Sequence, residues 1–383
     1  MEKKLKKLSF IIATHVYATG PSFKLEDFLK KKVESLIFIG HPFSFTKDTR
    51  SFIRIYKKGK LVFENKFVTW QGPESLFYLK DILLTLWWSF QYGKDVGYFV
   101  GVNNFNAFAG YLLKLLGRVR KIIFYTIDYI PQRFENNSLN YVYHFLDQLA
   151  IKKSDKVWNL SPIMVKEREK KGVRARYREK QITVPIGTDV RKKPLAFRAI
   201  DRYKIIFMGH IREGQGVEML IHAMRDVIKK IPEAHLLIIG GGPLENNMRN
   251  QVKRLKLEKK VKFTGFVKKF TDVQKYLQDG AIAVAPYVDD SRTYTRYTDP
   301  GKPKDYLASG LPVVITKVPQ VAYEIEKNKC GLAINYNKRE LTDAIVRLLK
   351  DEGKLSFFRK NAFKMAEKYG WDKIFDEAFL NTL

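Results

Sequence analysis

The amino-acid sequence predicts an α/β protein with doubly wound parallel sheets, and three observations support this fold class. Short apolar runs rich in β-branched residues, such as residues 311–315, alternate with helical segments along the chain, as expected of strands buried on both faces of a parallel sheet. Glycine-rich turns follow several of these runs, at positions where such sheets place ligands. With 383 residues, the chain is long enough for two domains that each have a core.

The first half of the chain is expected to form one such domain. Its predicted strands are residues 8–13, 35–39, 96–100, 121–127 and 155–160, with a hairpin formed by residues 52–56 and 61–68. Its predicted helices are residues 24–32, 73–92, 107–116, 136–152 and a very basic segment at 166–178. Residues 189–201 are predicted to be a linker.

The second half repeats the alternation. Its predicted strands are residues 203–208, 235–239, 261–267, 282–286 and 311–315. Its predicted helices are residues 217–230, 244–255, 273–278, 305–309, 341–350 and 355–369. A last helix, at about 371–379, is expected to return to the first domain.

One segment, residues 299–315, combines a polar loop, a short helix and a buried strand. Prolines and a glycine at 300–303 are expected to prevent a regular helix before Lys304. A helix of one to two turns then ends at Gly310, at a position that suits left-handed backbone.

The charged residues of this segment suggest a ligand. A helix N-terminus is a site of positive potential, where an anion can bind. Lys302 and Lys304 add formal positive charge beside it, and Asp305 can accept hydrogen bonds from a pair of sugar hydroxyls. This combination fits a nucleotide-sugar, with the diphosphate near the lysine and the ribose on the carboxylate.

The segment resembles the signature of retaining GT-B glycosyltransferases of family 4 (glycosyl transferases group 1), Pro-x-Lys-x-x-Glu-Tyr-Leu-Ala-x-Gly-x-Pro-Val-Val. Lys302 falls on the pattern's lysine, and Asp305 falls on its ribose-binding glutamate, shortened by one methylene. The family often has a second glutamate eight positions earlier, where this chain has Tyr297. Asp299 could replace that carboxylate from the same loop.

The resemblance implies the GT-B fold, in which two Rossmann-like domains face each other across a cleft. Residues 1–189 would then bind the acceptor, residues 190–369 would bind the nucleotide-sugar, and residues 370–383 would form the returning helix. A simple βαβ turn whose lysine and aspartate are solvated is the alternative.

A second glycine-rich turn, Gly209 to Gly216, lies between a predicted strand and a predicted helix and suits a phosphate. Family members usually have Arg and Lys where this chain has His210 and Gln215, and Arg212 is the nearest cation that could compensate. The donor-binding residues implied by the resemblance are Gly209, His210, Arg212, Gln215, Gly216, Gly241, Phe266, Val267, Asp299, Lys302 and Asp305.

In the first half, polar residues follow three predicted strands. His15 and Gly20 lie after the first strand, and Asn103 and Asn104 lie in a later loop, so all four are candidates for acceptor binding. A structural role for His15 is an equal alternative. Asp128 ends a strand where family members commonly have a histidine, and it is a candidate catalytic residue together with Lys302 and Arg212.

Residues 73–92 form a predicted helix whose apolar positions cover nearly its whole circumference. Such a helix is either deeply buried or lies against a membrane. Trp87, Trp88, Tyr92 and Lys94 resemble the residues of an interfacial belt. Packing on the sheet and membrane contact remain equal alternatives for this helix.

Composition narrows the classes of function. The formal net charge of +30 indicates an anionic partner (nucleic acid, a membrane surface or phosphorylated substrates) or serves solubility alone. The single cysteine, Cys330, excludes a disulfide framework and fits a reducing compartment. The six histidines are scattered, so no metal site is expected. No apolar run reaches the ~20 residues that span a bilayer.

The sequence therefore predicts a metal-independent glycosyltransferase of the hexosyltransferase type, without a cofactor, that uses a UDP- or GDP-sugar as donor. The expected acceptor is a lipid-linked or membrane-surface glycan, and the expected location is cytoplasmic, peripheral on the inner face of the cell membrane. A basic nucleic-acid-binding protein and a nucleotide-sugar epimerase of the same fold are the alternatives. Because no nucleic-acid-binding signature is present, nucleic acid is not an expected partner.

Overall fold

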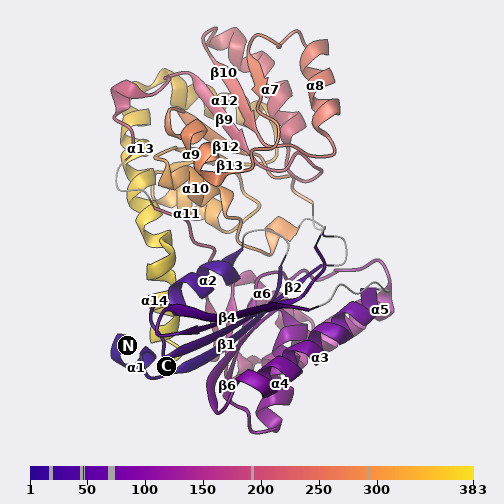
Figure 1. The fold of residues 1–383 in the computed structure, drawn as a ribbon. Coiled ribbons are helices and arrows are strands. Elements are labelled where there is room, and N and C mark those ends of the chain that lie inside the picture. Colours follow the sequence, from indigo (N-terminus) through magenta and orange to yellow (C-terminus); the bar gives the residue numbers. More distant parts are fainter. Residues whose placement is uncertain (17–19, 44–45, 47, 68–73, 191–193, 291–293) are drawn as a thin grey trace. The chain divides into compact units, whose positions relative to one another are not determined.

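The computed structural model describes the whole chain except residues 17–19, 44–45, 47, 68–73, 191–193 and 291–293. The chain divides into two compact units (Figure 1). Unit 1 comprises Met1–Pro185 and Asp372–Leu383, and unit 2 comprises Ile186–Trp371.

Unit 1 contains a mostly parallel sheet with strand order β4-β3-β2-β1-β5-β6-β7-β8. Only the pairs β2–β3 and β3–β4 are antiparallel among the described strands. The strands are β1 (Ser9–Val16), β2 (Ser35–Pro42), β3 (Phe52–Lys57), β4 (Lys60–Lys66), β5 (Val96–Val102), β6 (Val119–Thr126), β7 (Lys156–Asn159) and β8 (Gln181–Thr183).

Alternate residues of β1 pack on opposite faces of this sheet, as the period of a strand requires. Ile11 belongs to a core cluster with Leu84 and Trp88 of α3 (Glu74–Tyr92). Phe10, its neighbour, packs edge-on against Phe379 of α14 (Trp371–Leu380), with ring centroids 5.6 Å apart. The C-terminal helix thus completes the core of unit 1.

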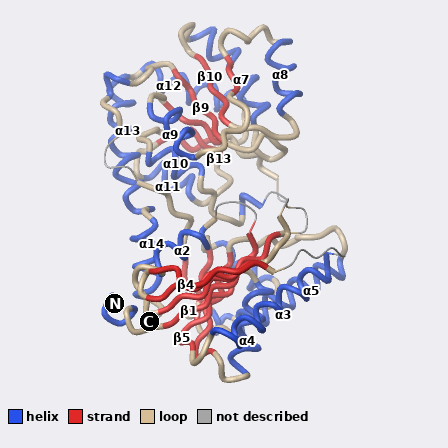
Figure 2. Tube along the Cα trace, viewed as in Figure 1, coloured by secondary structure: helices blue, strands red, loops and turns tan. Residues whose placement is uncertain are grey.

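The helices of unit 1 cover both faces of the sheet, and α3, α4 and α5 lie side by side on one of them (Figure 2). The remaining bounds are α1 (Glu2–Leu5), α2 (Pro21–Leu29), α4 (Asn104–Leu115), α5 (Asn137–Lys153) and α6 (Ile163–Lys170), with a 3-10 turn at Ala175–Tyr177.

Unit 2 contains a parallel sheet with strand order β11-β10-β9-β12-β13-β14. Its strands are β9 (Lys204–Met208), β10 (His235–Ile239), β11 (Val261–Phe263), β12 (Ile282–Ala285), β13 (Val313–Thr316) and β14 (Gly331–Ile334). Its helices are α7 (Val217–Lys230), α8 (Glu245–Arg254), α9 (Phe270–Gln278), α10 (Lys302–Ala308), α11 (Val321–Lys327), α12 (Lys338–Lys350) and α13 (Glu352–Ala366), with 3-10 turns at Phe197–Ala199, Tyr294–Arg296 and Glu367–Tyr369. The predicted fold class, α/β with two parallel-sheet domains, is confirmed.

Several predicted elements differ from the structure in their bounds, and three of these differences have a clear local cause. Helix α10 begins at Lys302, before the predicted start, because a proline is tolerated in the first helical turn, where its missing N–H costs nothing. Strand β11 ends at Phe263, four residues early, and Gly265 adopts a positive φ of 67° beyond it. The basic helix α6 ends at Lys170 and Gly172 follows it with a φ of 93°.

The apolar circumference of α3 is buried on one side and exposed on the other. Its residues divide into a buried face, which includes Trp88, and an exposed face, which includes Trp87. The two indoles therefore do not form a joint interfacial pair, because Trp87 reaches solvent and Trp88 does not. Among the described residues, none of the helices combines the length and the hydropathy needed to cross a bilayer.

Candidate functional site

The candidate donor site lies where the strand order of unit 2 reverses. From β9 the chain proceeds outward to β10 and β11, and then returns to the other side of β9 as β12. Ligands of doubly wound sheets bind outside the carboxyl ends of the strands at such a switch point. The loop after β9, which begins at Gly209, and the loop after β12, which leads to α10, both leave the sheet there.

Glycines allow the backbone to pack closely at this edge. A Cβ atom on Gly216 would lie 1.7 Å from the carbonyl oxygen of Pro286, and one on Gly240 would lie 2.2 Å from the carbonyl oxygen of Gly209. Gly209, Gly216 and Gly240 also have positive φ angles, of 149°, 68° and 126°. A side chain at any of these positions would force the turns apart.

Lys302 lies against the first of these glycines. A Cβ atom on Gly209 would lie 2.3 Å from the Nζ atom of Lys302, so the lysine occupies the space that a side chain would take. Its ammonium donates a hydrogen bond to Oε1 of Gln215 and lies 5.4 Å from the ring of Phe207 and 5.5 Å from that of Tyr287. No carboxylate of the described residues forms an ion pair with it.

The surroundings of Lys302 disfavour its charge. Burial, together with the positive charge of Arg212, lowers the pKa of Lys302 from 10.5 to about 7. A half-buried cation whose protein neighbours are an amide and aromatic rings is well placed to bind an anion, which would restore the charged form.

Arg212 and His210 lie on the same turn. The Nη2 atom of Arg212 donates a hydrogen bond of 2.8 Å to the hydroxyl of Tyr294, and its guanidinium lies 5.1 Å from the centre of that ring. Partial burial, followed by the charges of Arg212 and Lys302, lowers the pKa of His210. Arg212 is thus close enough to Lys302 for their charges to interact, and its role as a compensating cation stays a prediction.

Helix α10 is fixed against the sheet by Tyr306. The backbone N–H of Met208 donates a 2.7 Å hydrogen bond to the Tyr306 hydroxyl, which lies 3.2 Å from the Met208 carbonyl oxygen. The Tyr306 hydroxyl therefore connects α10 to the last residue of β9. In the first turn, Oδ1 of Asp305 accepts a 2.7 Å hydrogen bond from the hydroxyl of Thr188.

Asp299 has a different environment from the one expected. Its Oδ2 atom accepts a 2.7 Å hydrogen bond from the N–H of Ile186 and forms an ion pair with Lys304, whose ammonium also donates to the Ile186 carbonyl oxygen at 2.7 Å. Both side chains are buried. The expected contact of Asp299 with the donor sugar is therefore not supported, because this carboxylate is already paired with the buried lysine and holds the segment that enters unit 2.

The remaining donor residues lie at the ends of β10 and β11. The N–H of Ile211 donates a 2.9 Å hydrogen bond to the carbonyl oxygen of Gly241, which joins the two glycine turns. A Cβ atom on Gly241 would lie 3.3 Å from the backbone nitrogen of Phe266. Phe266 is 83% exposed, and Val267 follows it in an irregular segment.

In unit 1, a partly enclosed cavity lies at the corresponding switch point, between the ends of β1 and β5. His15, Asn103, Asn104 and Asp128 all line it. The other lining residues are Phe43, Tyr78, Phe105, Phe124, Thr126, Arg133, Phe134, Tyr143 and Asp147. The structure thus brings four of the five candidates of unit 1 together, whereas Gly20 lies at the start of α2 and does not line the cavity.

Asp128 is paired with an arginine that the sequence reasoning did not identify. The Nη1 atom of Arg133 donates a 2.6 Å hydrogen bond to Oδ2 of Asp128, whose side chain is 41% exposed. The side-chain oxygen of Asn103 has no hydrogen-bond partner among the described residues. The cavity therefore offers a carboxylate, a guanidinium and an amide oxygen to a ligand.

His15 has a structural environment. Its Nε2 atom lies 3.1 Å from Oδ2 of Asp81, and its Nδ1 atom lies 3.1 Å from Nδ2 of Asn106. Asp81 also contacts the fully buried His41, whose pKa burial lowers to about 3. Because both nitrogens of His15 are engaged, its ring shapes the cavity wall, in line with the structural alternative.

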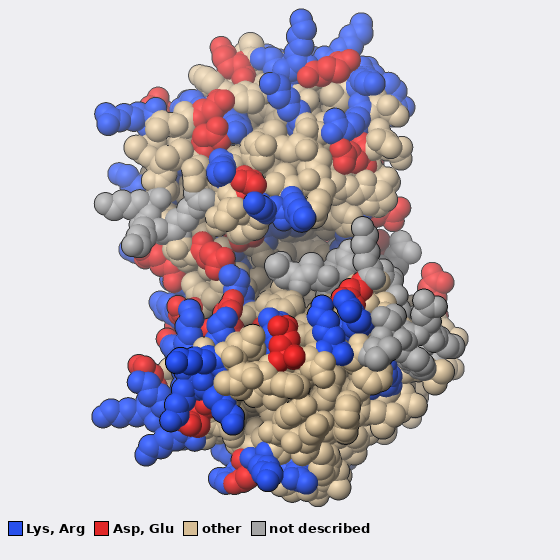
Figure 3. Space-filling view, in the orientation of Figure 1, with Lys and Arg blue, Asp and Glu red and all other residues tan. Residues whose placement is uncertain are grey.

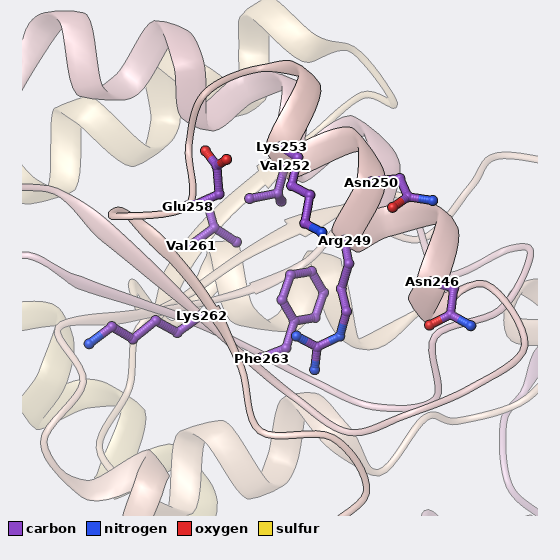
Figure 4. A pocket seen from close by; sticks show the side chains of 9 residues that line it. All are labelled: Asn246, Arg249, Asn250, Val252, Lys253, Glu258, Val261, Lys262 and Phe263. Atoms are coloured by element: carbon purple, nitrogen blue, oxygen red, sulfur yellow. The ribbon is translucent and has the colours of Figure 1, made fainter.

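A larger hollow, of 760 Å³, lies elsewhere in unit 2, between α8 and the edge strand β11 (Figure 4). It is lined by residues such as Asn246, Lys253 and Lys262, and by none of the predicted site residues. Arg249 in its wall forms an ion pair with Glu245. The edge position, away from the switch point at β9, distinguishes this hollow from the candidate donor site.

Known proteins resemble the chain in two ways. A sequence model of the family described as "Glycosyl transferases group 1" matches residues 202–351, within unit 2. An uncharacterized glycosyltransferase of Methanocaldococcus jannaschii is 28% identical over 179 residues, which is 46% of this chain and 44% of that protein. The match thus spans less than half of this relative's length.

Solved structures match nearly the whole chain. Sucrose-phosphate synthase from Thermosynechococcus elongatus has a TM-score of 0.73 at 16% identity, covering 98% of both chains. Anabaena HepE, solved in complex with UDP, has a TM-score of 0.70 at 14% identity, covering 98% of this chain and 100% of that chain. The fold is therefore that of GT-B glycosyltransferases.

Proposed function

We propose that the protein is a retaining glycosyltransferase of family 4 that transfers a hexose from a nucleoside diphosphate sugar to an acceptor. Unit 2 would bind the donor and unit 1 the acceptor. The match of the group 1 family model to unit 2 supports the assignment, as does the fold that the chain shares with a UDP-binding protein.

The observation that carries the proposal is the position of Lys302. Its ammonium lies at the switch point of the sheet on a half-buried side chain, against a glycine and beside the backbone turn that begins at Gly209. A nucleoside diphosphate supplies the negative charge that this lysine lacks among its described protein neighbours. Hydrogen-bond donors of the turn would bind the same phosphates.

In the proposed reaction, the bond between the anomeric carbon and the β-phosphate oxygen of the donor breaks. The electron pair of that bond stays on the phosphate oxygen, and the positive charges of Lys302 and Arg212 would stabilise it there, without a metal ion. Fixed cations and dipoles that meet developing charge contribute strongly to catalysis in a site that excludes water. Asp305 would hold the ribose through its carboxylate.

The acceptor would bind at the mouth of the cavity of unit 1, whose volume is 30 Å³. The oxygen of the acceptor hydroxyl would form the new bond to the anomeric carbon, and Asp128, which accepts a hydrogen bond from that hydroxyl, would take its proton. Asn103 would position the acceptor through its side-chain oxygen. We propose a lipid-linked or membrane-surface glycan as acceptor, because unit 1 exposes an extensive apolar surface beside this cavity.

The test is a thermal-shift screen of the full chain against UDP, GDP and other nucleoside diphosphates, because ligands that bind only the folded state raise its melting temperature. At least one nucleoside diphosphate is expected to stabilise the protein, and the Lys302→Met variant is expected to lose this effect. Incubating the matching nucleotide-sugar with lipid-linked glycans should then release the nucleoside diphosphate, with an α-sugar giving an α-linked product. Failure of every nucleotide to bind the wild-type protein would overturn the proposal.

A further inference from the structure

One face of α3 carries an uninterrupted row of exposed apolar side chains. The spacing of the row, three or four residues between members, places it along one side of the helix. Its central members, Leu79, Leu83 and Trp87, are 52%, 56% and 54% exposed. The row consists of Leu76, Leu79, Leu83, Trp87 and Phe90.

The neighbouring helices extend this row into a surface. Helix α4 packs between α3 and α5 on the same face of the sheet (Figure 2). Leu115 of α4 is 65% exposed, and Phe108 and Leu112 of the same helix are partly exposed. Helix α5 contributes Leu139, Val142 and Phe145, all exposed. We call the outer surface of α3, α4 and α5 the apolar face.

The apolar face matches in size the largest exposed apolar patches of soluble monomers, which are often functional. Its 19-residue helix α3 is about 28 Å long at 1.5 Å per residue, and neighbouring helices pack roughly 10 Å apart. Exposed apolar patches on soluble monomers rarely exceed about 300–600 Å², and larger ones mark interaction sites. In Figure 3, the lower right part of unit 1 is accordingly almost free of charged side chains.

Cations border the apolar face. The guanidinium of Arg118 lies 4.5 Å from the ring centre of Phe90, and the ammonium of Lys153 lies 5.1 Å from that of Tyr111. Long basic side chains that lie on apolar surface and extend their charge beyond it are typical of proteins at a membrane interface. The chain as a whole has a net charge of +30, which favours an anionic surface.

We propose that the apolar face is a docking surface for an anionic membrane, with α3 and α5 lying in the plane of the lipid headgroups. A second copy of the chain fits less well. A two-fold contact through this face would bring the basic borders of two strongly cationic molecules together, and like charges across an interface oppose association.

The apolar face is continuous with the cavity of unit 1. Tyr78 of α3, Phe105 of α4 and Tyr143 of α5 all line that cavity, and the rings of Tyr78 and Phe105 stack with centroids 4.5 Å apart. In the proposed function, a lipid-linked acceptor would keep its chain in the membrane and present its polar head at the mouth of this cavity, whose own volume is 30 Å³. The binding of a lipid-linked acceptor at the cavity rests on the proposed function, whereas the docking of the apolar face on a membrane does not.

The experiment compares the wild-type protein with the double variant Leu83→Ser/Trp87→Ser in sedimentation with vesicles. One set of vesicles contains phosphatidylcholine and phosphatidylglycerol, and the other contains phosphatidylcholine alone. The matched control is Phe357→Ser on α13 in unit 2, where the wild-type side chain is similarly exposed, at 48%. Circular dichroism and melting temperature establish that each variant is folded.

The wild type and the control variant are expected to sediment with the anionic vesicles, and the double variant is expected to bind at least about tenfold more weakly. The difference should persist at high salt, because apolar insertion is not screened as charge attraction is. Brominated phosphatidylcholine should quench wild-type tryptophan fluorescence more than that of Trp87→Phe.

Three results would overturn the inference: no binding of the wild type to anionic vesicles, equal binding of the double variant, or a wild-type dimer in light scattering that the double variant abolishes without loss of vesicle binding. Affinity for UDP is expected to be the same in the wild type and the double variant. Absence of nucleotide binding would therefore refute the proposed function and leave the docking result standing.

Discussion

The lowered pKa of Lys302 leads to a quantitative prediction for nucleotide binding. In the free protein this pKa is about 7, because Gln215, two aromatic rings and Gly209 shield the ammonium from water, with Arg212 nearby. A bound diphosphate would stabilise the charged form and raise the pKa again. Above pH 7, binding then requires the uptake of a proton.

The magnitude follows from proton linkage. If the pKa of Lys302 in the complex lies well above the pH, the dissociation constant for UDP increases up to tenfold per pH unit above the free pKa, or about 1.4 kcal/mol per unit. Titration of the UDP phosphate does not obscure this trend, because its second pKa is about 6 and the phosphate keeps nearly the same charge above pH 7. From pH 7 to pH 9 the affinity is expected to fall by about fiftyfold.

The assay is isothermal titration calorimetry with UDP at several pH values, each in two buffers with different ionisation enthalpies. The wild type should take up close to one proton per UDP at pH 8.5, and Lys302→Met should take up none. Lys275→Met, at an exposed lysine in an ion pair with Asp272, serves as the control and should behave like the wild type. Tight binding that does not change from pH 7 to pH 9, with no proton uptake, would refute the reasoning.

Three further predictions concern the same unit. Asp305→Ala should weaken UDP binding by about 1.5–3 kcal/mol in calorimetry, because a charged hydrogen-bond acceptor for the ribose is lost. Gly209→Ala should abolish UDP binding in a folded protein, since the new Cβ would displace the ammonium of Lys302, 2.3 Å away. Lys304→Met should lower the free energy of unfolding by about 3–5 kcal/mol in urea titrations, because Asp299 would remain buried without its partner.

Controls distinguish these effects from general damage. Inorganic pyrophosphate should bind Asp305→Ala as it binds the wild type, and equal losses for pyrophosphate and UDP would contradict the ribose role. Gly172→Ala, at a glycine with a φ of 93° and no neighbour within 4 Å of a Cβ, reproduces the backbone strain alone and should keep nucleotide binding. For the buried pair, the double variant Lys304→Met/Asp299→Leu should recover part of the lost stability; no recovery would mean that the charge of Asp299 is not the cause.

The lowered pKa of Lys302 also affects folding. Between pH 7 and pH 10.5 the unfolded chain binds a proton at this lysine that the folded protein does not, so the contribution of Lys302 to stability increases as the pH rises through this range. The melting temperature of the wild type relative to Lys302→Met should therefore rise from pH 7 to pH 10. If the difference in melting temperature between the wild type and Lys302→Met does not change with pH, the lowered pKa is contradicted.

Periodicity in the sequence was sufficient to predict most elements of the fold. Helix α7 has the predicted bounds, because Leu220, Met224 and Val227 repeat at helical spacing and a glycine precedes its first residue. Sequence-based prediction fails where contacts between distant segments determine which side of a helix is buried. Composition could not show that α3 buries Trp88 and exposes Trp87, since the sheet covers only one side of the helix.

The candidate site shows the same division. Lys302 and the glycine turns could be identified from local sequence, because close backbone approach requires glycine. The pairing of Asp299 with Lys304 could not be predicted from local sequence. Both side chains also form hydrogen bonds with the backbone of Ile186, which lies 113 positions away from Asp299 in the chain. The pairing of Asp128 with Arg133 was also missed, although an arginine five positions after the carboxylate was a visible signal.

The most direct test of the proposed function is a crystal structure of the full chain with UDP. The pyrophosphate is expected to lie against the turn from Gly209 to Gly216, within hydrogen-bond distance of the Lys302 ammonium, with the ribose hydroxyls on Asp305. UDP bound elsewhere, for example in the hollow between α8 and β11, with Lys302 still bonded only to Gln215, would contradict the account.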